Sequence, residues 1–358
     1  MKILFLVPYP TEGASNRIRV EQFIPYLESR GISCKVRPFM NTPFYRILYS
    51  PGKIFEKGFW FVICTLNRLL DMIRAFYYDV VFIHREAYPL GGPFIETVLS
   101  WTGKTIVFDF DDAIFLPNTS RQNIRIEKFK RPSKIAKIIN MSRLVIVGNS
   151  YLGEYAERFN KNTFVIPSSV DTDTYKPSTE SRHGAEIVIG WIGSNTTKAF
   201  LYDIEDVFVA LARRYNNVVF KIVGATFYSD RLKNVVNVKW SLANEPRDIQ
   251  SFDIGIMPMP DNEWTKGKCG YKALLYMACG IPVVVSPVGV NTEIVEEGVS
   301  GYLADEKDEW IRKIAILIDD PDKRKAMGRI GREKVMRKYS LAVLAPEYYI
   351  NVVERCRV

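Results

Sequence analysis

The chain alternates short, continuously apolar runs with segments whose apolar residues recur at helical spacing. Residues 2–7 are the first such run, and residues 17–30, which precede Gly31, are the first helical segment. Short runs without polar alternation are typical of parallel strands that are buried on both faces. In the first half of the chain the pattern predicts further strands at residues 34–38, 80–83, 105–108, 144–147 and 164–166.

The same alternation starts again after residue 185. We predict a strand at 186–191, a helix near 203–214, and a helix at 272–279 that glycine and proline close at residues 280 and 282. The other strands predicted in this half are 218–223, 238–240, 254–257 and 282–286. Alternating strands and helices predict the α/β class with doubly wound parallel sheets.

Because the series occurs twice, we predict two Rossmann-like domains. The first would span residues 1–170 and the second 171–335, joined through a polar stretch at 168–178. Open α/β sheets bind ligands at the carboxyl ends of their strands. Two such domains would therefore face each other across an interdomain cleft that holds the ligands.

The charge balance narrows the choice of ligand. With 49 Lys and Arg against 40 Asp and Glu, the net charge is +9, which indicates an anionic partner. The basic residues form no reading helix or aromatic platform, which argues against nucleic acid. The five cysteines are scattered without C-x-x-C spacing, and His84 lies far from His183, so we expect no disulfide framework and no metal site. A reducing compartment, the cytoplasm, fits this pattern.

Residues 40–78 are rich in aromatic, aliphatic and basic side chains. A helix from Phe59 could lie at a membrane interface, or could be a core helix with one solvated face. The loop 43–55 is the stronger anchor candidate, and the basic run 121–137 is either a second membrane contact or a solvated surface. No run reaches the roughly 18 apolar residues that span a bilayer, and no cleavage site follows the first run, so we expect a soluble or peripheral protein.

Two loops have the composition of phosphate cradles. In residues 8–19, Gly13 precedes a helix, and Arg17 and Arg19 add positive charge. Residues 193–198 form a second loop of this kind in the second half of the chain. Its candidates for binding the donor are Gly193, Ser194 and Lys198. Either loop could also be an ordinary strand-to-helix turn with an N-cap.

Three carboxylates follow the strand predicted at 105–108, namely Asp109, Asp111 and Asp112. Their mutual repulsion costs stability, so such a cluster belongs to a site more often than to a fold. They could bind a divalent metal, hydrogen-bond sugar hydroxyls, act as a base, or cap the next helix.

Lysines cluster before the helix at 272–279. Lys266, Lys268 and Lys272 are expected to converge there, while Gly267 and Gly270 free the backbone. Like charges so placed repel each other unless an anion binds, so we interpret the cluster as an anion site rather than a plain solvated turn.

Residues 267–303, GKCGYKALLYMACGIPVVVSPVGVNTEIVEEGVSGYL, resemble the donor-binding stretch of family 4 glycosyltransferases of the GT-B fold. The segments DFDDAIF and VIPSSVDTDTYKP resemble the family's first-domain and interdomain motifs. The ending MGRIGREKVMRKYSL is similar to its C-terminal helices, which implies that residues 336–358 return to the first domain.

The resemblance implies transfer of a sugar from a nucleotide donor with retention of configuration and without a metal or other cofactor. Protein cations and helix dipoles would neutralise the leaving diphosphate. It places Asp111 beside the transferred sugar or the acceptor, with Asp112 supporting it. The implied diphosphate contacts are Ser194, Lys198, Lys268 and Lys272. The implied donor-lining residues, acting chiefly through backbone N–H groups, are Val290, Asn291, Thr292 and Glu293.

The sequence departs from the family in one respect. The E-x7-E pair of the family would fall on Gly267 and Leu275, and Leu275 cannot bind ribose hydroxyls. Asp261 or Glu263 is the candidate substitute.

We therefore predict a hexosyltransferase at the inner face of the cytoplasmic membrane, acting on a lipid-linked or glycan acceptor in lipopolysaccharide or other polysaccharide assembly. The alternatives are a GT-B-like nucleotide-sugar epimerase and a degenerate subunit that binds a nucleotide or glycan.

Overall fold

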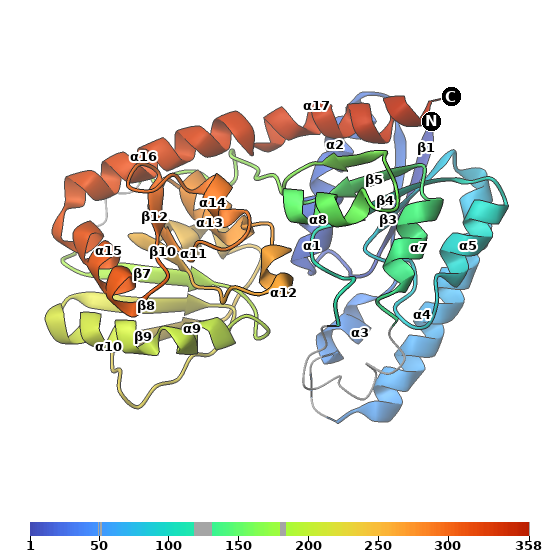
Figure 1. Ribbon diagram of the computed structural model, residues 1–358. Helices are drawn as coiled ribbons and strands as arrows, with labels where there is room; N and C mark the ends of the chain where they lie inside the picture. Colours follow the sequence, from blue (N-terminus) through green and yellow to red (C-terminus); the bar gives the residue numbers. More distant parts are fainter. Residues whose placement is uncertain (49, 51, 118–130, 180–183, 358) are drawn as a thin grey trace. The chain divides into compact units, whose positions relative to one another are not determined.

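The computed structural model describes residues 1–48, 50, 52–117, 131–179 and 184–357. The chain forms two compact units (Figure 1). Unit 1 comprises Met1–Ser168 and Leu344–Val358, and unit 2 comprises Ser169–Val343. Unit 2 runs beyond the expected end at 335 because Val170 exchanges backbone hydrogen bonds with Tyr339 and Leu341, both 2.8 Å long.

Each unit contains a six-stranded parallel sheet, which confirms the predicted α/β class. The strand order in unit 1 is β2-β1-β3-β4-β5-β6. Its strands are β1 (Lys2–Val7), β2 (Ser33–Pro38), β3 (Val80–His84), β4 (Thr105–Phe110), β5 (Leu144–Val147) and β6 (Thr163–Val165). The strand β4 is two residues longer than predicted, so Asp109 lies inside the sheet, in register with His84 of β3.

The helix predicted at 17–30 is broken in the structure. The helix α1 (Ala14–Arg19) ends at Val20, whose φ of −130° is not helical, and the chain continues as a short 3-10 turn and α2 (Ile24–Ser29). Pro25 fits the first turn of α2, where no N–H partner is needed. The other helices of unit 1 are α3 (Thr42–Ile47), α4 (Ile54–Arg74), α5 (Phe94–Trp101), α7 (Lys134–Met141), α8 (Ser150–Ala156) and most of α17 (Leu341–Val352).

The segment 43–55 is not the loop that we predicted. Most of it belongs to α3 and to the start of α4, and Asn41 caps α3 by accepting a 2.9 Å hydrogen bond from the Phe44 N–H. Phe44 is buried, which removes it from any membrane contact, whereas Phe55 is exposed. Of the basic run predicted at 121–137, residues 121–130 lie outside the described part of the chain.

In unit 2 the strand order is β12-β11-β10-β7-β8-β9. The strands are β7 (Ile187–Ile192), β8 (Val218–Val223), β9 (Val235–Val238), β10 (Ile254–Met257), β11 (Val283–Val285) and β12 (Gly301–Leu303). The strand predicted at 238–240 was wrong by three residues. Pairing with β8 ends at Val238, and Trp240 instead turns to donate its indole N–H to Glu245.

Helices cover both faces of this sheet (Figure 1). Side chains of β7 alternate between the two cores, with Val188 and Ile192 in one and Ile189 and Trp191 in the other. The helices are α9 (Ala199–Asp203), α10 (Glu205–Arg214), α11 (Glu245–Gln250), α12 (Glu263–Lys266), α13 (Tyr271–Ala278), α14 (Asn291–Ile294), α15 (Lys307–Asp319) and α16 (Pro321–Lys338).

The helix α13 packs unusually close to the sheet. A Cβ placed on Gly255 would come within 2.4 Å of the Tyr276 ring. This close approach lets the buried Tyr276 hydroxyl accept a 2.9 Å hydrogen bond from the Ile192 N–H at the end of β7. The helix α13 is thereby joined to the carboxyl end of β7.

None of the described helices combines the length and apolar character that crossing a bilayer requires.

The close contact of α13 gives a stability prediction. Changing Gly255 to Ala should lower the free energy of unfolding by about 1–3 kcal/mol, because the Tyr276 ring must move. Urea unfolding measures the change. Gly58→Ala is the control, since a Cβ there meets nothing within 4 Å and α4 should lose no stability. Equal stability of the two variants would contradict the described packing.

Candidate functional site

Unit 1 gathers charged and polar side chains where β1, β3 and β4 end. We call this group the acidic cluster. Its members come from α1, from the end of β3 and from the end of β4, and they are Ser15, Arg19, His84, Arg85, Asp109, Asp111 and Asp112.

Asp109 is the buried centre of the acidic cluster. Its carboxylate accepts a 2.5 Å hydrogen bond from Arg19 and faces the Nδ1 atom of His84 at 2.6 Å. Arg19 also donates to the Ile166 carbonyl at 2.6 Å. Asp109 and His84 are fully buried and Arg19 is 1% exposed. The expectation that Arg19 faces a diphosphate was therefore wrong, because its guanidinium neutralises an internal carboxylate.

Asp111 and Asp112 share Arg85. The guanidinium donates to Asp111 at 2.8 Å and to Asp112 at 2.6 Å. Burial opposes ionisation of Asp111, but the positive charge of Arg85, followed by those of His84 and Arg19, outweighs it and lowers the pKa of Asp111 below its ordinary value. Asp111 is thus held as a carboxylate.

Arg85 has strained backbone. Its φ of 63° lies in the left-handed region that non-glycine residues rarely adopt. The conformation is held by a 2.7 Å hydrogen bond from the Arg85 N–H to the Asp109 carbonyl and by the two carboxylates. Strain of this kind concentrates at functional sites, and costs about 1–3 kcal/mol.

Ser15 links His84 to Asp111. Its hydroxyl donates to Asp111 at 2.8 Å and lies 2.6 Å from the Nε2 atom of His84. The Nδ1 atom of the same ring faces Asp109. His84 therefore lies between Asp109 and Ser15, and Ser15 connects it to Asp111.

Gly13 and Arg17, predicted to contact the donor, shape the loop before α1. A Cβ on Gly13 would come within 2.5 Å of the Tyr9 Cβ, so this position needs glycine for packing. Arg17 donates to the carbonyls of Thr11 and Glu12 at 3.0 and 3.2 Å. Both residues therefore have a role in the loop itself.

In unit 2 the loop after β7 and the start of α13 lie together. We call Trp191, Gly193, Thr197 and Lys272 the lysine cradle. The Nζ atom of Lys272 lies 5.2 Å from the centre of the Trp191 ring and 3.5 Å from the Thr197 hydroxyl. A Cβ on Gly193 would come within 2.9 Å of the Lys272 Cε, so glycine makes this approach possible.

The other predicted donor residues of this loop flank the cradle. The Ser194 hydroxyl lies 2.6 Å from that of Thr196, and the Ser194 carbonyl accepts from the N–H groups of Thr197 and Lys198. Lys198 extends to the Thr226 carbonyl at 3.4 Å. Sequence reasoning selected Gly193, Ser194 and Lys198 and included Thr197 in the loop 193–198, but it did not select Trp191.

The three lysines around the start of α13, which we expect to converge, make different contacts. Lys266 lies 3.2 Å from Glu263, which raises its pKa, and 3.7 Å from Asp261. The Nζ atom of Lys268 lies over the Trp264 ring, 3.7 Å from its centre. Gly267, between these two lysines, is buried. Lys272 lies in α13 itself and reaches Trp191 and Thr197 of the cradle.

The helix α14 and its N-cap Val290 hold the four residues predicted to line the donor. The N–H groups of Asn291, Thr292 and Glu293 already donate to carbonyls three residues earlier, at 3.0–3.3 Å. Asn291 is fully buried and donates to the Ser286 carbonyl, and Val290 packs near Gly270. Of the four, Thr292 and Glu293 are exposed.

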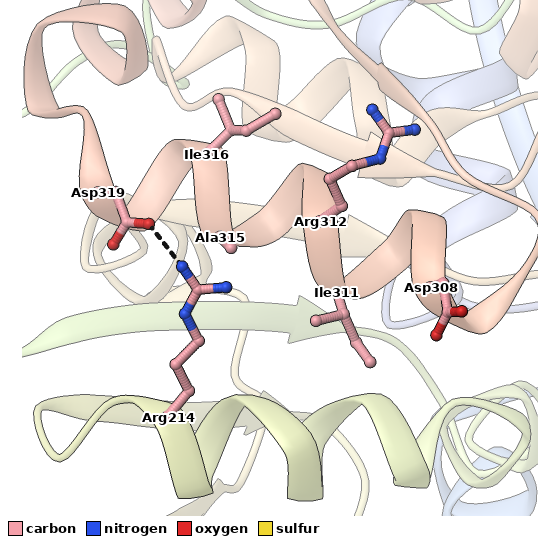
Figure 2. Close-up of a pocket in the computed structure, with 7 residues that line it drawn as sticks. All are labelled: Arg214, Asp308, Ile311, Arg312, Ala315, Ile316 and Asp319. Atoms are coloured by element: carbon pink, nitrogen blue, oxygen red, sulfur yellow. Dashed lines mark hydrogen bonds and ion pairs between the residues drawn. The ribbon is translucent and has the colours of Figure 1, made fainter.

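A shallow groove between α10 and α15 is shown in Figure 2. It holds a 3.2 Å ion pair between Arg214 and Asp319, and both side chains are exposed. Exposed pairs of this kind contribute at most about 1 kcal/mol. The groove contains none of the predicted site residues.

Comparisons with known proteins bear on the family and the fold of the chain. Residues 186–320 match the family model described as Glycosyl transferases group 1. Spore coat protein SA of Bacillus subtilis is 22% identical over 283 residues, which are 69% of this chain and 74% of that protein. D-inositol 3-phosphate glycosyltransferase of Thermobispora bispora is 36% identical over 110 residues, 30% of this chain and 24% of that protein.

Solved structures share the fold. HepE of Anabaena, solved in complex with UDP and glucose, has a TM-score of 0.70 and 19% identity, covering 99% of this chain and all of that one. Sucrose-phosphate synthase of Thermosynechococcus elongatus has a TM-score of 0.69 and 16% identity, with 97% of both chains covered.

The two sheets and these matches define a glycosyltransferase of the GT-B fold. The group 1 glycosyltransferase domain of the chain occupies residues 186–320, within unit 2.

The link through Ser15 gives a first prediction for the site. Ser15→Ala should lower kcat about tenfold, because one charged hydrogen bond that orients Asp111 is lost. Binding of nucleotide, measured by calorimetry, should stay unchanged. Ser29→Ala, at an exposed hydroxyl, serves as the control. Full turnover in Ser15→Ala would show that the acidic cluster takes no part in the reaction.

The lysine cradle gives a second prediction. Lys272→Met should weaken nucleoside diphosphate binding roughly 10–100-fold, the effect of losing one charged hydrogen bond of about 1.5–3 kcal/mol. Lys266→Met is a matched control, because Lys266 pairs with Asp261 and Glu263. Calorimetry measures the affinity of both variants for the nucleoside diphosphate. Equal affinities would refute the lysine cradle as the diphosphate site.

Proposed function

We propose that this glycosyltransferase moves a sugar from a nucleotide-sugar donor, with retention of configuration and without a metal ion, to a membrane-associated glycolipid or polysaccharide acceptor. The enzyme would work as a peripheral protein at the inner face of the cytoplasmic membrane. Its donor would bind in unit 2 and its acceptor at the acidic cluster of unit 1.

The lysine cradle is the observation that carries this proposal. A cation, a hydroxyl and a glycine-lined backbone meet at the carboxyl end of β7, where α/β sheets bind their ligands. Such donors stabilise the charge that develops on a departing diphosphate. HepE, which has the same fold, was solved with UDP and glucose, and this supports a nucleotide sugar as the donor.

The pairing of the carboxylates supports transfer without a metal. Asp109 is bound by Arg19 and His84, and Asp111 and Asp112 are bound by Arg85. Their oxygens are thus already neutralised by protein cations. Among the described residues, no group of three or more His, Cys, Asp or Glu side chains is placed to hold a metal ion.

Asp111 is the residue that we assign to the acceptor or the transferred sugar. It is ionised, partly accessible and fixed by Arg85 and Ser15, so it can accept a hydrogen bond from a sugar hydroxyl in a constant position. Asp112 would act through Arg85, which it shares with Asp111. Retention of configuration is proposed from the resemblance of residues 267–303 to family 4 enzymes.

Two other functions remain as outcomes to be tested. Leu275, where the family has a glutamate, is buried in the core of unit 2 and cannot contact a ribose. This position favours a subunit that binds a nucleotide without transferring a sugar, unless Asp261 or Glu263 replaces the lost contact. An epimerase would use the donor alone.

A panel of nucleotide sugars separates these functions. We expect release of nucleoside diphosphate that depends on acceptor and persists in chelator, and a product with the donor's anomeric configuration by NMR. Asp111→Asn should lower turnover and leave nucleotide affinity unchanged. Binding without release would identify a degenerate subunit, a changed sugar without release would identify an epimerase, and activity restored only by manganese would contradict the metal-free proposal.

A further inference from the structure

The helix α4 turns two of its charged residues, Arg68 and Asp71, inward. Arg68, 1% exposed, donates to the carbonyls of Val7 and Arg37 at 2.9 and 3.1 Å, and burial lowers its pKa to about 10. Asp71, 3% exposed, pairs with Arg37 and Arg74. These contacts fix which side of α4 faces unit 1.

The opposite side of α4 is apolar and faces outward. The exposed residues recur three to four positions apart along the whole helix, so they form one continuous stripe. Phe55 at its start is 95% exposed. We call this stripe and the turn that follows it the α4 face, which comprises Ile54, Phe55, Phe59, Val62, Leu66, Leu69, Leu70, Ile73, Phe76 and Tyr77.

The α4 face is a second apolar side of the helix, in addition to Trp60, Phe61 and Cys64, which pack in a core cluster of unit 1. In a helix that packs on a protein, the apolar stripe lies inward and the charged residues lie outward. The alternative interpretation of this helix as part of the core was therefore wrong for its apolar stripe. Contiguous exposed apolar surface of this kind marks a place where something docks.

Positive charge borders the α4 face at both ends. Lys53 lies directly before its first turn and Lys57 within it, and Lys53 is about half exposed. At the other end Lys104 lies over the Phe76 ring, 5.6 Å from its centre, and Arg74 is about half exposed. Glu56 is an acidic residue on this surface, beside Lys53.

Exposed aromatic rings accompany these cations. Trp101, at the end of the neighbouring helix α5, is 83% exposed, and Tyr77 is 78% exposed. Aromatic and basic side chains around an apolar stripe match the headgroup region of a bilayer, where rings sit at the interface and cations meet anionic lipids.

We propose that the α4 face is a membrane-docking surface, on which α4 lies in the plane of an anionic bilayer. A helix of 21 residues is about 32 Å long. Its apolar side chains would enter the acyl boundary while the bordering cations contact lipid phosphates. The inference deepens the proposed function, because it names the surface that brings the enzyme to its membrane-associated acceptor.

Vesicle cosedimentation tests the inference. Wild-type protein should bind phosphatidylglycerol vesicles at least tenfold more tightly than phosphatidylcholine vesicles, and binding should weaken as salt rises. The double variant F55E/L66E should lose at least tenfold in affinity for the anionic vesicles. Both positions are exposed, so the variant should fold, and thermal unfolding with unchanged nucleotide affinity verifies this.

The double variant V299E/M336E is the matched control. It adds the same charge at two exposed apolar positions of unit 2 and should bind vesicles as wild type does. Equal losses in both double variants would overturn the inference, as would equal binding of wild type to neutral and anionic vesicles. A wild-type dimer that F55E/L66E dissociates, without any vesicle binding, would assign the face to a second copy of the chain instead.

The outcomes distinguish this inference from the proposed function. Nucleotide-sugar turnover without vesicle binding would overturn the docking surface alone. Vesicle binding without nucleotide affinity would overturn the proposed transfer and leave the docking surface standing.

Discussion

Unit 1 depends on the compensation of one buried charge, that of Asp109. Removing an ionised carboxylate from water costs several kcal/mol, and the loss of a partner from such a pair destabilises a protein by about 3–5 kcal/mol. Arg19 comes from α1, His84 from the end of β3 and Asp109 from β4. Satisfying this charge therefore joins α1 to the ends of β3 and β4 in one arrangement. Asp111 lies two residues after Asp109, on the same side of the chain, so the contacts that fix Asp109 also fix the position of Asp111.

Unit 2 reaches a defined site by different means. Here close packing places the cation: Tyr276 joins α13 to the end of β7, and the missing side chain of Gly193 leaves space for Lys272. Positive charge is thus placed at a strand end. The acidic cluster holds carboxylates that cations of unit 1 itself bind, whereas the lysine cradle presents a cation beside a hydroxyl and a glycine. We therefore propose that the diphosphate binds in unit 2.

The fold class could be predicted from the sequence, because buried parallel strands appear in it as short, continuously apolar runs. The runs at 144–147, 218–223 and 254–257 coincide with β5, β8 and β10. The short strand β12 was not predicted, because it consists of only a few residues. The strand at 238–240 was misplaced, because a tertiary contact of Trp240 decides where that strand ends. At the site, Asp111 and Lys272 were chosen from local chemistry. His84 and Arg85 were missed because their partners are about 25 residues away, although both follow a predicted strand, as the chosen aspartates do.

The orientation of α4 also could not be derived from its sequence. Its apolar stripe is compatible with a core helix, and burying one large apolar side chain contributes about 1.5–3 kcal/mol. The buried contacts of Arg68 decide otherwise, since rotating the stripe inward would separate this guanidinium from the carbonyls of Val7 and Arg37. Val7 is the last residue of β1, directly before the loop and helix that carry Ser15. The contact that turns the apolar stripe outward is therefore made at the same strand end that positions the acidic cluster, so the docking surface and the candidate acceptor site share one rigid support.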